Sequence, residues 1–153
     1  MDKTATKLVI FGIMLLAATL LLAAGCSRKM SKRAINPPGS VEGLPFSNGI
    51  LVGRTLYVAG QEGLDSGKLR PGGIAAETQA ALENIKRIVE AAGLRMDDVV
   101  SVNVYLADIG EWGDMNKVYK TFFPEPRPTR AAIQVKLGGE ARVEISAIAV
   151  KAH

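Results

Sequence analysis

The sequence predicts an α+β domain with the element order β-β-α-β-α-β-β, in which a mixed sheet carries both helices on one face. Two observations support this fold class. Five short segments alternate apolar and polar residues, as strands with one buried face do, and two longer segments repeat apolar residues at helical spacing. Because each helix connects two strands, both helices are crossovers that cover the sheet, and 153 residues suffice for one such domain.

The first half of the domain is predicted to contain a hairpin, a loop and a helix. Residues 49–52 and 55–60 have the composition of strands, and Gly53 lies between them where a tight turn is required. Residues 61–73 are polar and contain four glycines and a proline, which indicates a loop. Apolar residues then recur at helical spacing over residues 74–92, so we expect a helix there.

The second half is predicted to contain a strand, a helix and two closing strands. The first strand follows two aspartates and places four apolar residues on one face: Val100, Val102, Val104 and Leu106. A helix over residues 111–123 has one apolar side, and the three prolines between 124 and 128 prevent it from continuing. Residues 129–136 and 141–151 alternate again and complete the sheet.

Packing both helices on one face leaves the other face of the sheet uncovered. The alternation assigns a mixed set of side chains to this open face: Ser101, Asn103, Tyr105, Glu144, Ser146, Ile148 and Val150. Ile148 and Val150 are poor residues to leave in water. We therefore expect the open face to pack against other copies of the chain, as in a closed ring.

Residues 1–25 have the pattern of a secretory signal rather than of a stable membrane span. Two lysines precede an uncharged, mostly apolar run over residues 8–24, which leads into Gly25-Cys26. This pattern resembles a bacterial lipoprotein signal, and the resemblance implies cleavage before Cys26 and lipidation of its thiol. The alternative is an ordinary cysteine beside an uncleaved anchor. Either arrangement places the domain in the cell envelope, facing outside the cytoplasm, and at the outer membrane in a Gram-negative cell.

Residues 26–43 are expected to form a tether that leads into a domain at residues 44–153. Residues 27–33 carry four basic side chains and no acid, and the next stretch is rich in proline, glycine and serine. The tether either attracts anionic lipid or serves only as a solubilising linker. From residue 34 onward the chain has 13 basic and 14 acidic residues, a net charge of −1. The sequence therefore does not support a nucleic-acid surface.

The sequence lacks the residues that several common kinds of site require. No cluster of His, Cys and Asp has metal-ligand spacing, and no phosphate-binding loop is present. A Ser-His-Asp set is not possible with a single histidine at the terminus, His153. Cys26 is the only cysteine, so no intrachain disulfide can form. We expect neither a metal nor a cofactor.

Two charged residues on the last two strands carry the most information about function. Arg130 lies in the segment 127–135 and Glu144 in the segment 142–147, and both are flanked by small and apolar residues. Burying a charge is costly unless the charge is paired or held for use. A fixed guanidinium can bind a carboxylate through two parallel hydrogen bonds, and a glutamate can transfer protons or orient water. The two residues suggest a pocket for a small acid; the alternative is a structural ion pair between neighbouring strands.

Over residues 45–150 the sequence resembles the Rid family of reactive intermediate deaminases, also called the YjgF family. The resemblance rests on these motifs: Arg127-Pro128-Thr129-Arg130, Val143-Glu144-Ile145, Ala59-Gly60-Gln61, Glu83-Asn84-Ile85, Glu90-Ala91-Ala92-Gly93-Leu94, and Asn116 with Tyr119 and Phe122-Phe123. It implies a chorismate-mutase-like homotrimer with three clefts between subunits. It further implies hydrolysis of enamines and imines of 2-keto acids, with release of ammonia and without a metal or cofactor.

The resemblance assigns a role to four residues. Arg130 matches the arginine that binds the substrate carboxylate, and Glu144 matches the glutamate that places or activates water. Gly60 matches the glycine whose backbone lines the pocket. Asn116 matches an asparagine of the pocket region.

Three positions depart from the family pattern. Phe46 stands where the archetypal deaminases have a tyrosine, and Ala59 stands where a serine is common. Ala132 replaces a frequent cysteine, although its backbone groups can still contact the substrate. These departures make the expected pocket more apolar and bear on both substrate choice and rate.

The sequence thus leaves three functions open. The first is hydrolysis of 2-imino acids, such as 2-iminobutanoate and 2-iminopropanoate, to the keto acid and ammonia. The second is an envelope module that binds a small carboxylate such as a 2-keto acid with little or no turnover, which the missing hydroxyls favour. The third is an interaction role for exposed surfaces of the trimer, which would not depend on Arg130.

Overall fold

The computed structural model describes residues 30–40 and 43–151. The signal expected at residues 1–25 and the lipidation site at Cys26 lie outside the described residues. The compact unit comprises residues 31–153. No helix in the described part of the chain is long and apolar enough to cross a membrane.

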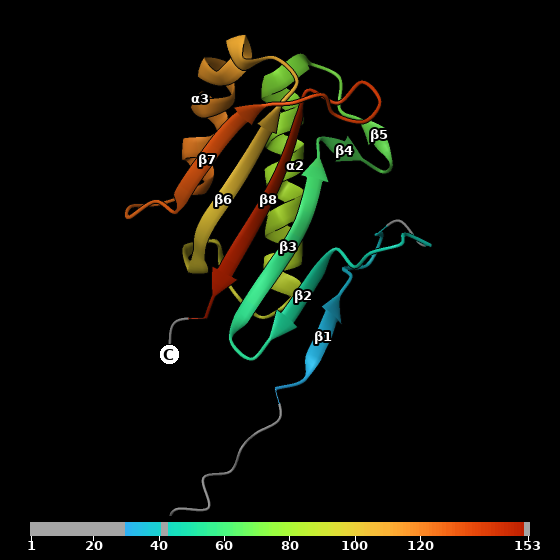
Figure 1. Cartoon of the computed structure of the whole chain (residues 1–153), viewed down its shortest axis with the longest axis vertical. Coiled ribbons are helices and arrows are strands. Elements are labelled where there is room, and N and C mark those ends of the chain that lie inside the picture. The colour runs from blue at the N-terminus through green and yellow to red at the C-terminus, as the bar shows by residue number, and fades with distance from the viewer. Residues whose placement is uncertain (1–29, 41–42, 152–153) are drawn as a thin grey trace, which may run out of the picture. The chain divides into compact units, whose positions relative to one another are not determined.

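A six-stranded mixed sheet forms the centre of the compact unit (Figure 1). Its strand order is β1-β2-β3-β8-β6-β7, and every neighbouring pair is antiparallel except β6 and β7, which are parallel. The strands are β1 (Lys32–Ile35), β2 (Gly49–Val52), β3 (Thr55–Glu62), β8 (Val143–Val150), β6 (Val99–Leu106) and β7 (Thr129–Gln134). The expected hairpin is present, and its turn contains Gly53 with a positive φ of 58°.

Two helices cover one face of this sheet, as the sequence predicts (Figure 1). They are α2 (Gly73–Ala91) and α3 (Trp112–Phe122), and short 3-10 turns precede β6 and α3 at Met96–Asp98 and Ile109–Glu111. The core between helices and sheet is apolar, and its largest fully buried side chains include Leu56, Leu82, Ile85, Leu106, Met115 and Ile145. Each buried side chain of this size contributes about 1.5–3 kcal/mol to folding.

The open face of the sheet carries the mixed set of side chains that the alternation predicts. Along β8, Glu144, Ser146 and Ile148 are half-buried, whereas the residues between them are buried under the helices. Tyr57 and Ile133 also lie on this face, opposite Ile148 and Tyr105 respectively, and are 51% and 52% exposed. The open face therefore presents a set of apolar side chains to solvent in the single chain.

A bulge in β6 corrects the expected position of Val100. The pairing of β6 with β8 shifts between Val99 and Ser101, so Val100 is an extra residue and its side chain is 45% exposed. Val99 occupies the core instead, at 4% exposure. The remaining predicted residues, Val102 and Val104 among them, are buried as expected.

Part of the expected tether is a strand. Residues 32–35 form β1, which pairs antiparallel with β2 at the edge of the sheet. Ile35 is 3% exposed and packs in the core, whereas the three residues before it are exposed. The boundary expected at residue 44 is thus too late. The basic residues of an edge strand face water and resemble a tether in composition, which conceals the strand.

The loop expected over residues 61–73 is partly strand as well. Strand β3 continues to Glu62, and β4 (Leu64–Asp65) and β5 (Lys68–Leu69) form a small separate hairpin. Its two turn residues, Ser66 and Gly67, both have positive φ angles of 50° and 82°. This is the conformation that a tight two-residue hairpin turn requires.

Candidate functional site

The predicted site residues lie in two separate hollows of the chain. The larger, which we call the Glu144 cavity, has a volume of about 550 Å³ and is lined by residues including Phe46, Gly60, Glu62, Asp65, Asn84, Arg87 and Glu144. The smaller, which we call the Arg130 pocket, has a volume of about 370 Å³. Its lining residues are Asn116, Tyr119, Lys120, Arg127, Pro128 and Arg130.

The position of Glu144 depends on the absence of a side chain at Gly60. Between Val58 and Gln61 the pairing of β3 with β8 shifts, so β3 has a bulge that includes Gly60. A Cβ atom at Gly60 would lie 1.7 Å from Oε1 of Glu144, which is far inside van der Waals contact. Only glycine therefore lets the Glu144 carboxylate lie against the backbone of β3.

Phe46 forms an apolar wall of the same cavity. It is 53% exposed and lies beside Leu44, another exposed apolar residue of the lining. The phenyl ring lacks the hydroxyl expected of the archetypal deaminases, so it contributes apolar surface only. Ala59, at the bulge beside Gly60, is not among the described residues that line the cavity.

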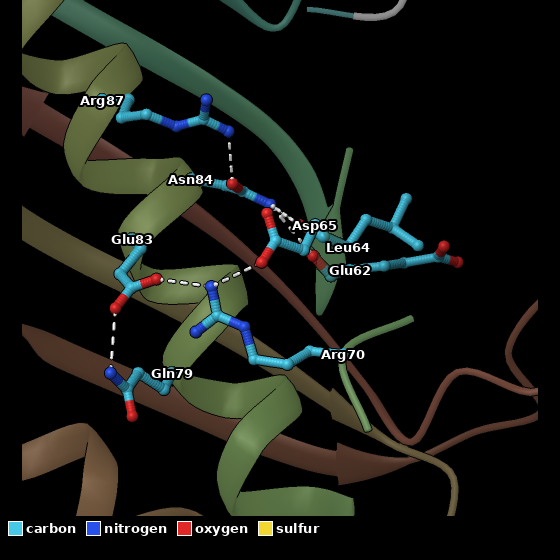
Figure 2. A network of polar contacts seen from close by, with 8 residues as sticks. All are labelled: Glu62, Leu64, Asp65, Arg70, Gln79, Glu83, Asn84 and Arg87. Carbon is cyan, nitrogen blue, oxygen red and sulfur yellow. Dashed lines mark hydrogen bonds and ion pairs between the residues drawn. The ribbon is translucent and has the colours of Figure 1, made fainter. Parts of the chain in front are cut away.

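A network of polar side chains fixes the β4–β5 hairpin to α2 and so builds another wall of the cavity (Figure 2). Asn84 of α2 donates hydrogen bonds to the backbone carbonyls of Glu62 and Leu64, at 3.4 and 3.0 Å. Arg70 bridges Glu83 at 2.8 Å and Asp65 at 3.3 Å. The hydrogen bond from Arg70 lowers the pKa of Glu83 and, reciprocally, raises that of Arg70.

The second hollow is organised around Arg130, which three residues of α3 contact. Its Nη1 donates to Oδ1 of Asn116 at 2.6 Å. Its Cζ lies 4.5 Å from the ring centroid of Tyr119 and 5.8 Å from that of Trp112, within range of cation–π attraction. The three partners are four and three residues apart along α3, so they share one face of that helix.

No carboxylate within residues 30–40 and 43–151 forms an ion pair with Arg130. Its known contacts are one amide oxygen and two aromatic rings, which orient the guanidinium without neutralising it. Burial raises the pKa of Tyr119 to about 12, so this phenol stays neutral at physiological pH. The Arg130 pocket therefore has a fixed positive charge and is suited to a carboxylate ligand.

Arg130 and Glu144 do not share a pocket within one chain. Arg130 pairs with Val102 and lies on the helix side of the sheet, whereas Glu144 pairs with Tyr105 and lies on the open face. Strand β6 separates β7 from β8. Two strand spacings across and three residues along place their Cα atoms roughly 14 Å apart. An ion pair between neighbouring strands is excluded for the same reason.

Three of the other predicted residues lie in one of the two hollows, and Ala132 lies in neither. Asn116 lies with Arg130, and both Gly60 and Phe46 lie with Glu144. Ala132 pairs with Val104, packs against the core and lines neither hollow. Within the described ranges, no group of three or more His, Cys, Asp or Glu side chains is arranged to hold a metal ion.

Glu62 is a cavity residue that the sequence analysis missed. It lies opposite Glu144 in the register of β3 and β8. The sequence does contain an indication of this position, because Glu62 is two positions after Gly60 and a strand places both residues on one face. The glycines that follow concealed it, since they suggested a loop from residue 61 onward.

Comparison with known proteins establishes the family. The sequence model of the family described as Endoribonuclease L-PSP matches residues 40–151. The chain is 47% identical over 110 residues to a Mus musculus protein named 2-iminobutanoate/2-iminopropanoate deaminase, covering 70% of this chain and 82% of that protein. It is 43% identical over 117 residues to the Homo sapiens protein of the same name, covering 74% and 84%.

Solved structures agree in fold. The YjgF gene product of E. coli matches with a TM-score of 0.71 at 31% identity, covering 78% of this chain and 99% of that one. A structure described as a putative endoribonuclease from Thermotoga maritima matches with a TM-score of 0.74 at 35% identity, covering 80% and 100%. The fold is thus the α+β, chorismate-mutase-like class expected from the sequence. The chain belongs to the Rid/YjgF/L-PSP family.

We predict that Gly60→Ala displaces the Glu144 carboxylate, because the new methyl group and Oε1 cannot occupy the same space. The carboxylate is the far end of a flexible side chain, so it should move aside and the free energy of unfolding should fall by less than about 1 kcal/mol. A crystal structure of the variant measures the displacement. Gly138→Ala is the matched control, because a Cβ atom there meets nothing within 4 Å and Glu144 should stay in place. An unmoved Glu144 carboxylate in Gly60→Ala would contradict the close approach of Gly60 and Glu144.

Proposed function

We propose that this protein hydrolyses imines and enamines of 2-keto acids, such as 2-iminobutanoate and 2-iminopropanoate, to the keto acid and ammonia. The observation that carries the proposal is the oriented guanidinium of Arg130, which has no carboxylate partner among the described residues. Relatives at 43–47% identity are named 2-iminobutanoate/2-iminopropanoate deaminase. A solved relative, E. coli TdcF, is described with bound serine, an amino acid with a free carboxylate.

In this proposal Arg130 binds the carboxylate that every 2-imino acid carries beside its C=N carbon. Asn116 and the ring of Tyr119 fix the direction of the guanidinium, and two parallel hydrogen bonds then fix the carboxylate. The electrophilic carbon is adjacent to the carboxylate, so its position is fixed as well. Such positioning supplies several kcal/mol of the rate enhancement.

Glu144 completes the chemistry by acting on water. Its carboxylate lines the cavity and forms no ion pair within the described part of the chain, so it is available to accept a proton. Water that gives a proton to Glu144 adds its oxygen to the imine carbon and forms a carbinolamine. Proton transfer to nitrogen and collapse of the adduct then release ammonia and leave the keto acid.

The two residues act on one substrate only if they come from different copies of the chain. Their separation and opposite faces rule out a joint site within one protomer. Strand β7 is at the edge of the sheet, where a second copy can approach the Arg130 pocket. We infer a homotrimer whose clefts each combine the Arg130 pocket of one subunit with the Glu144 cavity of the next. The exposed side chains of Tyr57 and Ile133 support this assembly, because an interface on the open face would bury them.

Binding of a small carboxylate with little turnover is the alternative that the pocket composition favours. Phe46 supplies no hydroxyl, and neither Ala59 nor Ala132 supplies a polar side chain. The family model is named for an endoribonuclease, but the net charge of −1 from residue 34 onward does not favour binding to a polyanion. Hydrolysis and binding without turnover differ in ammonia release, which can be measured.

We predict that Arg130→Ala lowers kcat/KM for imino acids by about 100-fold or more, because the reacting carbon is no longer positioned. The imino acids are generated in place by an amino-acid oxidase, and ammonia release is measured against the spontaneous rate. Arg95→Ala removes an arginine that is paired with Asp97 at an exposed position and serves as the control. Full activity of Arg130→Ala, or no acceleration by the wild type, would refute the proposed hydrolysis. Saturable keto-acid binding without acceleration would instead identify a binding module.

We predict that two inactive variants restore each other's activity if each site combines Arg130 of one subunit with Glu144 of the next. Homotrimers of Arg130→Ala and of Glu144→Ala should both be nearly inactive. When the two variants are mixed, unfolded and reassembled, about a quarter of the clefts receive an intact arginine and an intact glutamate, and activity returns in proportion. The molecular mass of the reassembled protein shows whether trimers have formed. Absence of complementation in well-formed mixed trimers would show that each site is built within one chain.

We further propose that residues 1–25 direct this protein to the cell envelope and that Cys26 is lipidated there. The support is the sequence pattern alone: a basic start, an apolar run and small residues before the cysteine. Expression of the full chain in a bacterium supplied with a labelled fatty acid should label the protein, and Cys26→Ser should abolish the label. Equal labelling of Cys26→Ser and the wild type, or no labelling of the wild type, would refute lipidation of Cys26.

A further inference from the structure

Glu62 faces the functional carboxylate directly. The register of β3 and β8 places Glu62 opposite Glu144, and opposite residues of an antiparallel pair point to the same face with Cβ atoms about 5 Å apart. Both side chains line the Glu144 cavity. Two like charges at this spacing destabilise a sheet, so the pair is a cost to the fold.

Neither Glu62 nor Glu144 forms an ion pair with a base within the described residues. Of the other charged groups that line the cavity, Asp65 is paired with Arg70, and Arg87 donates a hydrogen bond to Asn84. Glu77 of α2 contributes a further negative charge, although it accepts a hydrogen bond from the backbone of Arg142 and its Oε1 lies 3.9 Å from Nε of that arginine.

The surroundings therefore favour a proton on the pair. Burial raises the pKa of Glu62, and the negative charges of Glu144 and Glu77 raise it further. In the trimer proposed above, Arg130 of a neighbouring subunit would also face the cavity and oppose this effect. The substrate carboxylate neutralises that arginine when it binds, so the effect of the two glutamates dominates in the occupied cleft.

We propose that Glu62 is a second catalytic residue, which shares one proton with Glu144 and gives it to the leaving nitrogen. This inference rests on the proposed hydrolysis of imines. It provides an acid and a base in one cavity, as the reaction requires. In the addition of water Glu144 acts as the base, and Phe46 provides no hydroxyl to act as the acid.

The proton balance closes over one turnover. Glu144 takes a proton from water as the oxygen bonds to the imine carbon, while the C=N electron pair moves to nitrogen, which takes the proton of Glu62. The product of this step is the neutral carbinolamine. Protonated Glu144 then protonates nitrogen, Glu62 removes the hydroxyl proton, the C–N bond breaks and C=O forms. Ammonia leaves, and the proton is back on Glu62.

The test is the pH dependence of kcat, which reports the occupied cleft, for a 2-imino acid in the wild type and in Glu62→Gln, after subtraction of the spontaneous rate at each pH. The wild type should lose activity as the pH rises through the raised pKa of Glu62, where the pair loses its shared proton. Glu62→Gln should lower kcat by about 10- to 100-fold and should lack this basic limb. Glu62→Asp should retain the limb. Glu140→Gln, the same change outside the cavity, should leave the profile unchanged.

An unchanged pH profile in Glu62→Gln would overturn the proposal. A second measurement does not depend on turnover: titration of the glutamate carboxyls by carbon-13 NMR in the assembled protein saturated with a 2-keto acid, whose carboxylate occupies Arg130. The Glu62 pKa should lie above the ordinary value of glutamate and should fall in Glu144→Gln. If Glu62 titrates at the ordinary pKa of glutamate and its pKa does not change in Glu144→Gln, the proposed proton sharing between the two residues is refuted even if imines are hydrolysed. Conversely, a coupled pair in a wild type that hydrolyses no imine refutes the proposed function alone.

Discussion

The alternation of side chains between the two faces of one sheet is the constraint on which the rest of this structure depends. The helices cover one face only, so every strand residue is either under a helix or on the open face. Arg130 lies on the first side and Glu144 on the second. In the function proposed above, a single chain therefore carries two halves of a site, which a second copy of the chain would join. The same alternation leaves Tyr57 and Ile133 exposed where that copy would pack.

Each half of the site is held by neighbours that leave its charge available. Helix α3 surrounds Arg130 with an amide oxygen and two aromatic rings, which orient a cation without neutralising it. The Glu144 carboxylate lies against the bare backbone of Gly60, and the hairpin fixed by Asn84 forms a wall of its cavity. Within the described residues the charges of Arg130 and Glu144 form no ion pair, so they add no ion-pair energy to the stability of the fold. Proteins often accept such a loss of stability at functional sites.

Periodicity in the sequence predicted the helices, the central strands and the buried faces, because apolar spacing reports directly which side of an element is buried. It could not report strand order. Arg130 and Glu144 seemed to be neighbours because β7 and β8 are consecutive, yet β6 lies between them. Strand β1 and the bulge at Val100 were missed for a related reason. Both depend on pairing with another strand, which local composition does not encode.

The attachment of β1 also has a mechanical consequence. This edge strand is joined to the sheet by a single ladder, with β2. Immediately after it, Pro37, Gly39 and Ser40 line the Glu144 cavity. Tension on the residues that precede β1 would therefore be borne by the β1–β2 hydrogen bonds and transmitted to the wall of the cavity. The shape of the site is in this way connected to whatever force acts on the N-terminal part of the chain.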